Sequence, residues 1–207
     1  MVIITSMGGC ASTAIISWFG QHLECNCSHN SEGFINQDHT GNNKGLKHRI
    51  QPHVENDIYL PADIDKALFL FDSPYDIIPS LFRRKIAAAH AFAISGIRPT
   101  HNNNFDDFIK LEVDSFHFSQ QFGNWTNPDI KRTYPRLIVR SSSIWDHLDA
   151  VGEFLGLPPS IMSGFPPKKT RASSFDALAE SQRNGLGRIY GQIHNKINSY
   201  PVVSLIR

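Results

Sequence analysis

At 207 residues, the chain is long enough to fold as one domain, residues 1–207, with a sizeable core. Its 20 basic and 19 acidic residues nearly cancel, so general electrostatic attraction to nucleic acid or to a membrane surface is not expected, and any anion site must be local. The sequence lacks the apolar run of about 18 residues that a membrane span needs and the basic start of a signal peptide, so we expect a cytoplasmic chain.

The first elements are predicted to be a strand, a tight turn and a helix. Val2–Thr5 is typical of a short buried strand, and Ser12–Leu23 has apolar residues at helical spacing. Residues 24–56 are polar and are expected to form loops, with a short strand around Gly45–His48. The Cys-Asn-Cys triplet at residues 25–27 lacks the second cysteine pair of a zinc site, so no metal is expected there.

A second strand, Ala67–Phe71, is the clearest buried strand in the sequence. We expect a long helical stretch after it that ends near Ser95. A helix that began at Pro74 would hold Pro79 in its interior and lose a backbone hydrogen bond. With Asp76 as the N-cap, Pro79 would occupy the third helical position, where its missing N–H costs little, so we predict that start.

The second half is predicted to contain an amphipathic segment, a strand and two helices: Phe105–Phe122, Arg136–Arg140, Ile144–Leu155 and Phe175–Asn198. Ser143 and Asp146 form a capping-box pattern that would open the third of these, and Gly156 would close it. A basic loop, "FPPKKTRASS", precedes the final helix.

Strands that alternate with helices predict an α/β protein whose mainly parallel sheet is covered on both faces. Ligands of such sheets bind beyond the carboxyl ends of the strands. Three of the predicted loops should meet there: Gly8–Thr13, Asp72–Ser80 and Arg140–Ser143. Their convergence is the main physical indication of a site.

The turn after the first strand has the features of a phosphate cradle. Unpaired N–H groups at a helix start attract anions, Gly8 and Gly9 allow close approach, and Ser12 and Thr13 add hydroxyl donors. No Gly-Lys precedes the hydroxyl pair, so the Walker pattern of Mg²⁺-dependent ATP or GTP hydrolysis is not met. A purely structural turn with an N-cap serine explains this segment equally well.

Further motifs resemble the sulfotransferases that use 3′-phosphoadenosine 5′-phosphosulfate (PAPS). "ALFLFDSPYDIIPSLFRRK" resembles the strand–loop–helix that holds the 3′-phosphate in that family; the matching residues are Pro74, Tyr75, Asp76, Ser80, Arg83 and Arg84. "YPRLIVRSSSIWDHLDAVGEFLGLP" is similar to a later strand–helix segment of the family, and the opening turn looks like its 5′-phosphosulfate loop. "GLKHRI" resembles the Lys-x-His element that carries the catalytic base, at a similar spacing before Asp72.

The resemblance implies a three-layer P-loop fold, PAPS as sulfuryl donor, no metal, and a hydroxyl or amine acceptor. It assigns His48 as the base, and the cofactor-binding residues as Gly8, Gly9, Cys10, Ala11, Ser12, Thr13, Ser80, Arg84, Lys168, Lys169 and Arg171. The last three belong to a late basic loop that closes over the nucleotide in the family. The acceptor could be a small molecule, a glycan or a lipid, with residues 24–45 and 97–132 forming its pocket.

Two departures from the family pattern keep other functions open. Gly9-Cys10 stands where the family usually has a Lys or Arg that stabilises the leaving phosphate, a kind of contribution worth about 2.7–4 kcal/mol. Asp72 stands where an arginine grips the 3′-phosphate. A catalytically silent protein that binds a nucleotide or sulfated ligand is therefore an alternative, and a small-molecule kinase is a less favoured one.

Overall fold

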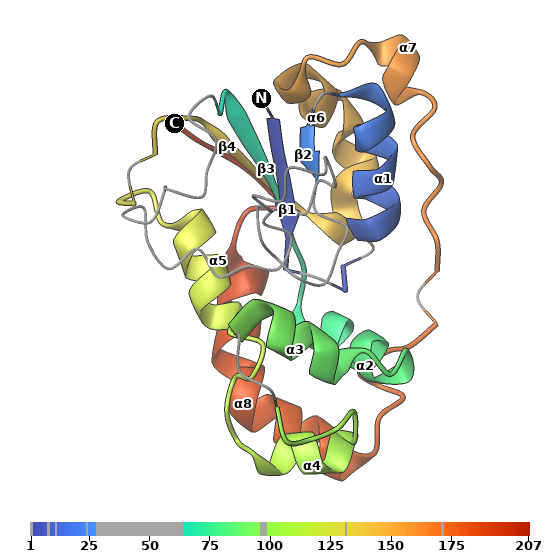
Figure 1. Cartoon of the computed structure of the whole chain (residues 1–207), viewed down its shortest axis with the longest axis vertical. Coiled ribbons are helices and arrows are strands. Elements are labelled where there is room, and N and C mark those ends of the chain that lie inside the picture. Colours follow the sequence, from blue (N-terminus) through green and yellow to red (C-terminus); the bar gives the residue numbers. More distant parts are fainter. Residues whose placement is uncertain are drawn as a thin grey trace, which may run out of the picture.

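The chain folds into a five-stranded sheet with helices around it (Figure 1). The computed structural model describes residues 2–7, 9–10, 12–23, 25–27, 64–95, 99–130, 132–170 and 172–207, without the side chains of residues 12–13, 25–27 and 93–95. The sheet has the order β2-β1-β3-β4-β5, from the strands Cys25–Cys27, Val2–Ser6, Lys66–Phe71, Arg136–Arg140 and Val203–Ile206. The first four are parallel and β5 is antiparallel to β4. The predicted α/β class with a mainly parallel sheet is confirmed.

Continuous apolar sequence accounts for the central strands. All residues of β1 are buried, as are those of β3 after Lys66, because both sheet faces are covered. Figure 1 shows α1 (Ser12–His22) and α6 (Leu148–Leu155) on one side and α5 (Phe118–Thr126) on the other. On the α5 side, Phe69 stacks on Trp125 with ring centroids 5.3 Å apart.

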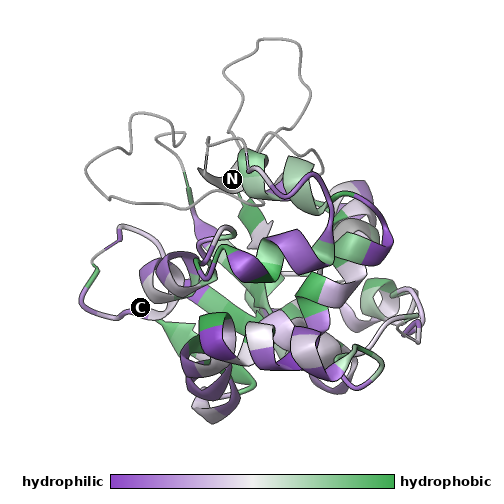
Figure 2. Ribbon diagram, turned by 90° about the horizontal axis from the view of Figure 1, so that it is seen from below, coloured by the Kyte–Doolittle hydropathy of each residue, from purple (hydrophilic) through white to green (hydrophobic). Residues whose placement is uncertain are grey.

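Four helices lie beyond the carboxyl ends of the strands (Figure 1): α2 (Pro74–Arg83), α3 (Ala87–Ser95), α4 (Phe105–Lys110) and α8 (Glu180–Ser199). Aromatic contacts hold this layer together. Phe108, for example, lies 5.0 Å from Phe82, 5.5 Å from Phe116 and 6.2 Å from Tyr190, measured between ring centroids. Figure 2 shows that apolar and polar residues alternate along these helices, as expected where one side of each helix is buried.

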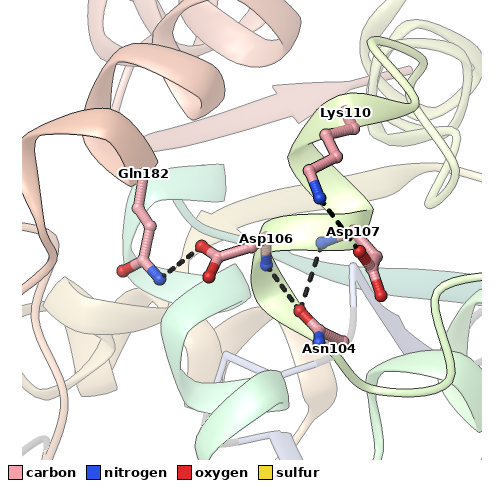
Figure 3. Close-up of polar contacts among 5 residues, drawn as sticks. All are labelled: Asn104, Asp106, Asp107, Lys110 and Gln182. Carbon is pink, nitrogen blue, oxygen red and sulfur yellow. Dashed lines mark hydrogen bonds and ion pairs between the residues drawn. The ribbon is translucent and has the colours of Figure 1, made fainter.

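The junction of α4 with α8 shows how polar groups join the helices of this layer (Figure 3). Asn104 caps α4, because its Oδ1 accepts from the backbone N–H groups of Asp106 at 2.9 Å and Asp107 at 3.2 Å. The side-chain amide of Gln182 then donates to the Asp106 carboxylate at 2.9 Å. One carboxylate in the first turn of α4 thus links that helix to the start of α8.

The predicted helical stretch after β3 is two helices, and it starts earlier than predicted. Ser73, not Asp76, is the N-cap: its Oγ accepts from the Tyr75 N–H at 3.1 Å, so α2 begins at Pro74. Pro79 is therefore inside the helix, where burial of its ring offsets part of the lost hydrogen bond. Lys85, with a φ of 56°, ends the turn that separates α2 from α3.

Later boundaries also differ from prediction. The Phe105–Phe122 segment divides into α4 and α5, separated by residues with positive φ at Glu112 and His117. The predicted Ile144–Leu155 helix begins as a 3₁₀ helix, η2 (Ser141–His147), without a capping bond from Ser143, and continues as α6. Gly156, with φ 77°, ends α6 as predicted. The short α7 (Pro159–Met162) follows, and α8 starts five residues later than expected.

Two edge strands were not predicted. β2 lies in a segment expected to be loop, and β5 closes the opposite edge by pairing with β4. The predicted strand at Gly45–His48 lies outside the described residues. Val2 and Ile206 both lie level with the first residues of β3 and β4. The described ends of the chain therefore lie at the same end of the sheet, where β3 and β4 begin. No helix among the described residues is long and apolar enough to cross a membrane.

Candidate functional site

The predicted convergence of loops beyond the sheet is confirmed for the described residues. Ser6 pairs with Leu70 and Phe71 pairs with Arg140, so β1, β3 and β4 end side by side. We call this side of the sheet the carboxyl edge and the opposite side, where these strands begin, the amino edge. The Met7 N–H donates to the Leu70 carbonyl at 3.0 Å, which holds the start of the opening turn against β3.

The described part of the opening turn packs against α2. Gly9 has a φ of +68°, and a Cβ there would lie 2.8 Å from Ile77 Cγ2 and 3.3 Å from Leu81 Cδ2. Cys10 is fully buried, and its thiol is 3.9 Å from the Leu70 carbonyl oxygen. Gly9 is therefore needed for the close approach of α2, whatever the turn binds. Gly8 and Ala11 lie outside the described residues, as do the side chains at 12 and 13.

Asp72, at the end of β3, is buried and accepts several hydrogen bonds. Its carboxylate lies 2.8 Å from Ser141 Oγ and 3.2 Å from Ser142 Oγ, and it accepts from the Ser73 N–H at 3.1 Å. These donors compensate the loss of solvation of the buried charge. Because the serines follow β4, the Asp72 carboxylate ties the ends of the two strands together.

A chain of polar contacts joins α8 to the same edge. Ser73 Oγ lies 2.7 Å from His194 Nδ1, and His194 Nε2 lies 2.8 Å from Asn198 Nδ2. Asn198 Oδ1 accepts from Arg140 at 3.4 Å, which leaves the amide nitrogen to donate to Nε2. This pattern assigns the imidazole proton to Nδ1, from which it is donated to Ser73.

Burial favours that neutral form of His194. It lowers the pKa of the imidazole; the carboxylate of Asp76 opposes this shift and the charge of Arg140 adds to it. The ring also stacks on Tyr75, with centroids 4.0 Å apart, and Phe175 covers Tyr75 at 4.3 Å. Burial raises the pKa of the Tyr75 phenol. Sequence reasoning missed His194, because nothing near it in the chain distinguishes it from the other nine histidines.

Two of the predicted phosphate ligands lie on α2 beside the opening turn. Arg84 folds back over the last turn of the helix, and its Nε donates to the Ser80 carbonyl at 3.2 Å. Burial lowers the pKa of the Arg84 guanidinium, as does Arg83, whereas an electrostatic interaction with Cys10 raises it.

The late basic loop is anchored next to the end of β4. Lys168 and Lys169 are exposed, and Lys168 Nζ lies 5.7 Å from the centroid of the Trp145 ring. The indole N–H of Trp145 donates to the Pro166 carbonyl at 2.8 Å, which fixes the path of the loop. Arg171 and the predicted base His48 lie outside the described residues.

A groove of about 460 Å³ lies between α5 and the end of α8. It is lined by Ser119, Gln120, Gly123, Asn124, Thr126, Asn127, Pro128, Ile130, Lys196 and Tyr200. Most of these residues belong to the 97–132 stretch in which an acceptor pocket is expected, but the contribution of α8 was not foreseen. Among the described residues, no group of three or more His, Cys, Asp or Glu side chains is placed to hold a metal.

Comparisons with known proteins add no family assignment. A scan against protein-family models and searches of curated proteins and of solved structures found no match to this chain.

Proposed function

We propose that this protein is a divergent PAPS-dependent sulfotransferase with the P-loop type of three-layer fold. It would move a sulfuryl group from PAPS to a hydroxyl or amine acceptor. The observation that carries this proposal is the packing of α2 on the opening turn, through Ile77 and Gly9. Ser80 lies three positions after Ile77 and Arg84 three positions after Leu81, so both are helical neighbours of the residues that face the turn, which suits a donor with phosphates at the 3′ and 5′ positions of its ribose.

The described residues suit binding of an anionic donor at the carboxyl edge. The amino end of α1 begins after the turn, and its unpaired N–H groups favour negative charge. Arg84 supplies a cation from α2, and Lys168 supplies one from the loop that follows α7. Because the net charge of the whole chain is only +1, binding of such a ligand requires cations close to the site.

In the proposed reaction the acceptor oxygen or nitrogen forms a bond to sulfur, and the bond between sulfur and the 5′-phosphate oxygen breaks. His48 accepts the proton that the acceptor loses. The opening turn stabilises the negative charge that develops on the 5′-phosphate, Ser80 and Arg84 hold the 3′-phosphate, and adenosine 3′,5′-bisphosphate is released. Orientation and charge stabilisation supply most of the acceleration, as in phosphoryl transfer.

The environment of Asp72 favours a second candidate, a non-catalytic protein that binds a nucleotide or a sulfated ligand. Its carboxylate is held in place by Ser141 and Ser142 and remains where the family has a phosphate-binding arginine. An anion so fixed weakens 3′-phosphate binding. Binding without turnover would identify this function.

Calorimetric titration with adenosine 3′,5′-bisphosphate, beside Mg·ATP, tests the proposal. We expect micromolar binding of the bisphosphate that weakens at least tenfold in the double variant Ser80→Ala/Arg84→Gln. Arg188→Gln is the control, because it removes the same charge from an exposed arginine of α8 that pairs with Glu112. Preference for Mg·ATP would indicate the kinase, and absence of binding to either nucleotide would overturn the proposal. A turnover assay with PAPS then separates the enzyme from the silent binding protein.

A further inference from the structure

The groove between α5 and α8 lies on the α5 side of the sheet, with Tyr200 toward the carboxyl edge and Asn127 and Ile130 toward the amino edge, where Arg136 contacts their carbonyls. Tyr200 connects the groove to the carboxyl edge: it lines the groove, and its ring packs edge-on against Phe71 at 5.8 Å and Phe122 at 5.3 Å. Phe71 is the last residue of β3, directly before Asp72. A ligand bound at the Tyr200 end of the groove would therefore lie near the end of β3.

The lining has the chemistry of a sugar site. Amide side chains such as Gln120 carry both donors and acceptors, and Ser119 adds a hydroxyl, which together suit a ligand rich in hydroxyl groups. Tyr200 contributes an aromatic ring. The volume of about 460 Å³ is within the range of small-ligand sites.

The charges of the residues that line the groove indicate the class of ligand. Of the described residues that line the groove, Lys196 carries a positive charge and none carries a carboxylate. Lys196, Ser119 and Gln120 are all exposed, so their polar groups are open to a ligand. Asp129 belongs to the loop at the rim, next to Pro128, but does not line the groove. Asp114 is close as well, since it accepts from the Ser119 N–H at 3.0 Å, but the lining itself holds one cation and no carboxylate, which favours a ligand with one negative group.

We propose that this groove binds an acidic sugar of the uronate class, with the ligand carboxylate at Lys196 and its hydroxyls at the amide and hydroxyl side chains. Resting on the proposed function, the inference names this sugar as the acceptor, whose hydroxyl would receive the sulfuryl group. Binding of the sugar itself does not depend on that function.

Gly123 allows the groove to be filled without disturbing the fold. It lies inside α5 and lines the groove, and a Cβ added there would meet no atom within 4 Å. Gly123→Leu should therefore block the groove while raising the unfolding temperature by up to about 4 °C, because leucine favours a helix more than glycine does. Gly20→Leu is the matched control, since Gly20 is a helical residue of α1 with equally open surroundings.

The test is a ligand-observed NMR titration with glucuronate, using glucose as the sugar without a carboxylate. We expect glucuronate to bind the wild type and Gly20→Leu, to bind Lys196→Gln about tenfold more weakly, and to show no binding to Gly123→Leu. Equal binding of glucose, or unchanged glucuronate binding in Gly123→Leu, would overturn the inference. Bisphosphate binding without glucuronate binding would refute this inference alone, and the reverse result would refute the proposed function alone.

Discussion

The two edges of the sheet use polar side chains in different ways. At the amino edge, β3 and β4 each begin with a cation that donates to the end of a helix. Lys66 Nζ lies 2.7 Å from the Phe154 carbonyl in α6, and Arg136 donates to the carbonyls of Trp125 and Asn127 at 3.3 and 3.4 Å, at the end of α5. Such cations complement the negative end of the helix dipole.

At the carboxyl edge, side chains pair mainly with one another. Asp72 is held by two serines, and Ser73 contacts His194. Arg140 ends the strand that Arg136 begins, yet it is half-buried whereas Arg136 is 2% exposed. Both edges thus anchor a helix, since Arg140 also donates to the Ile197 carbonyl of α8 at 2.6 Å, but at the carboxyl edge the side chains additionally link the strand ends to one another.

Replacing the buried arginine should produce the largest effect. Arg136→Met leaves the carbonyls of Trp125, Asn127 and Ile130 without their donor, so we expect a loss of about 3 kcal/mol in the free energy of unfolding. Denaturant unfolding measures it. Arg140→Met, at the other end of β4, removes the donor of the Ile197 carbonyl, but this arginine is only half-buried, so the loss should be only about 1 kcal/mol. Equal losses in the two variants would mean that the arginine at the amino edge contributes no more to stability than the one at the carboxyl edge.

Gly9→Ala tests whether the opening turn has a structural role of its own. The added methyl group would clash with Ile77, and alanine disfavours the left-handed backbone. We therefore expect the free energy of unfolding, measured by thermal unfolding, to fall by about 2 kcal/mol. Gly20→Ala, in open helical surroundings, should instead stabilise the chain by up to about 1 kcal/mol. A Gly9→Ala protein of wild-type stability that no longer binds bisphosphate would show that the glycine serves a ligand alone.

Asp72→Asn separates stability from ligand binding at the carboxyl edge. Asparagine keeps an acceptor for the serine hydroxyls, so unfolding should become easier by only about 1 kcal/mol. Removal of the negative charge should tighten bisphosphate binding several-fold, measured by calorimetry. Weaker binding would mean that Asp72 helps the ligand site by holding the strand ends together more than its negative charge repels the phosphate.

The smallest expected effect is a dependence of stability on pH, caused by His194 at the carboxyl edge. Because burial lowers the pKa of His194, the unfolded chain binds a proton more readily than the folded one, and stability falls as pH drops below about 6.5. His101, whose pKa burial also lowers, contributes in the same direction.

The unfolding midpoint at pH 5 to 8 should therefore vary less in His194→Gln than in the wild type. Lys66→Met, at the amino edge, should leave the slope unchanged, because this variant keeps both His194 and His101. A His194→Gln protein with the wild-type slope would show that protonation of His194 does not affect the fold.

The central strands could be predicted from the sequence because each is a continuous apolar run, and Gly156 correctly marked the end of α6. The helix breaks could not. They occur at Lys85, Glu112 and His117, residues that adopt positive φ without the glycine or proline that usually signals a turn. β2 has only three residues, too short for a periodicity to show.

The site was predictable only as a set of loops. The sheet rule located the carboxyl edge, but the contact between Ser73 and His194 spans 121 positions and depends on how α8 crosses that edge. Asp72 looked unfavourable in sequence because its partners, the serines after β4, could be identified only once the strands were paired. The groove likewise joins α5 to residues more than 60 positions away.

The arrangement of the chain ends has a practical consequence. Val2 and Ile206 both lie at the amino edge: Val2 pairs with the first residue of β3, and Ile206 pairs with the first residue of β4. An affinity tag or a biosensor tether attached at either end would therefore hold the molecule by the side opposite the carboxyl edge. Immobilised protein can present the same face to the solution from both attachments, so ligand binding measured with each should agree.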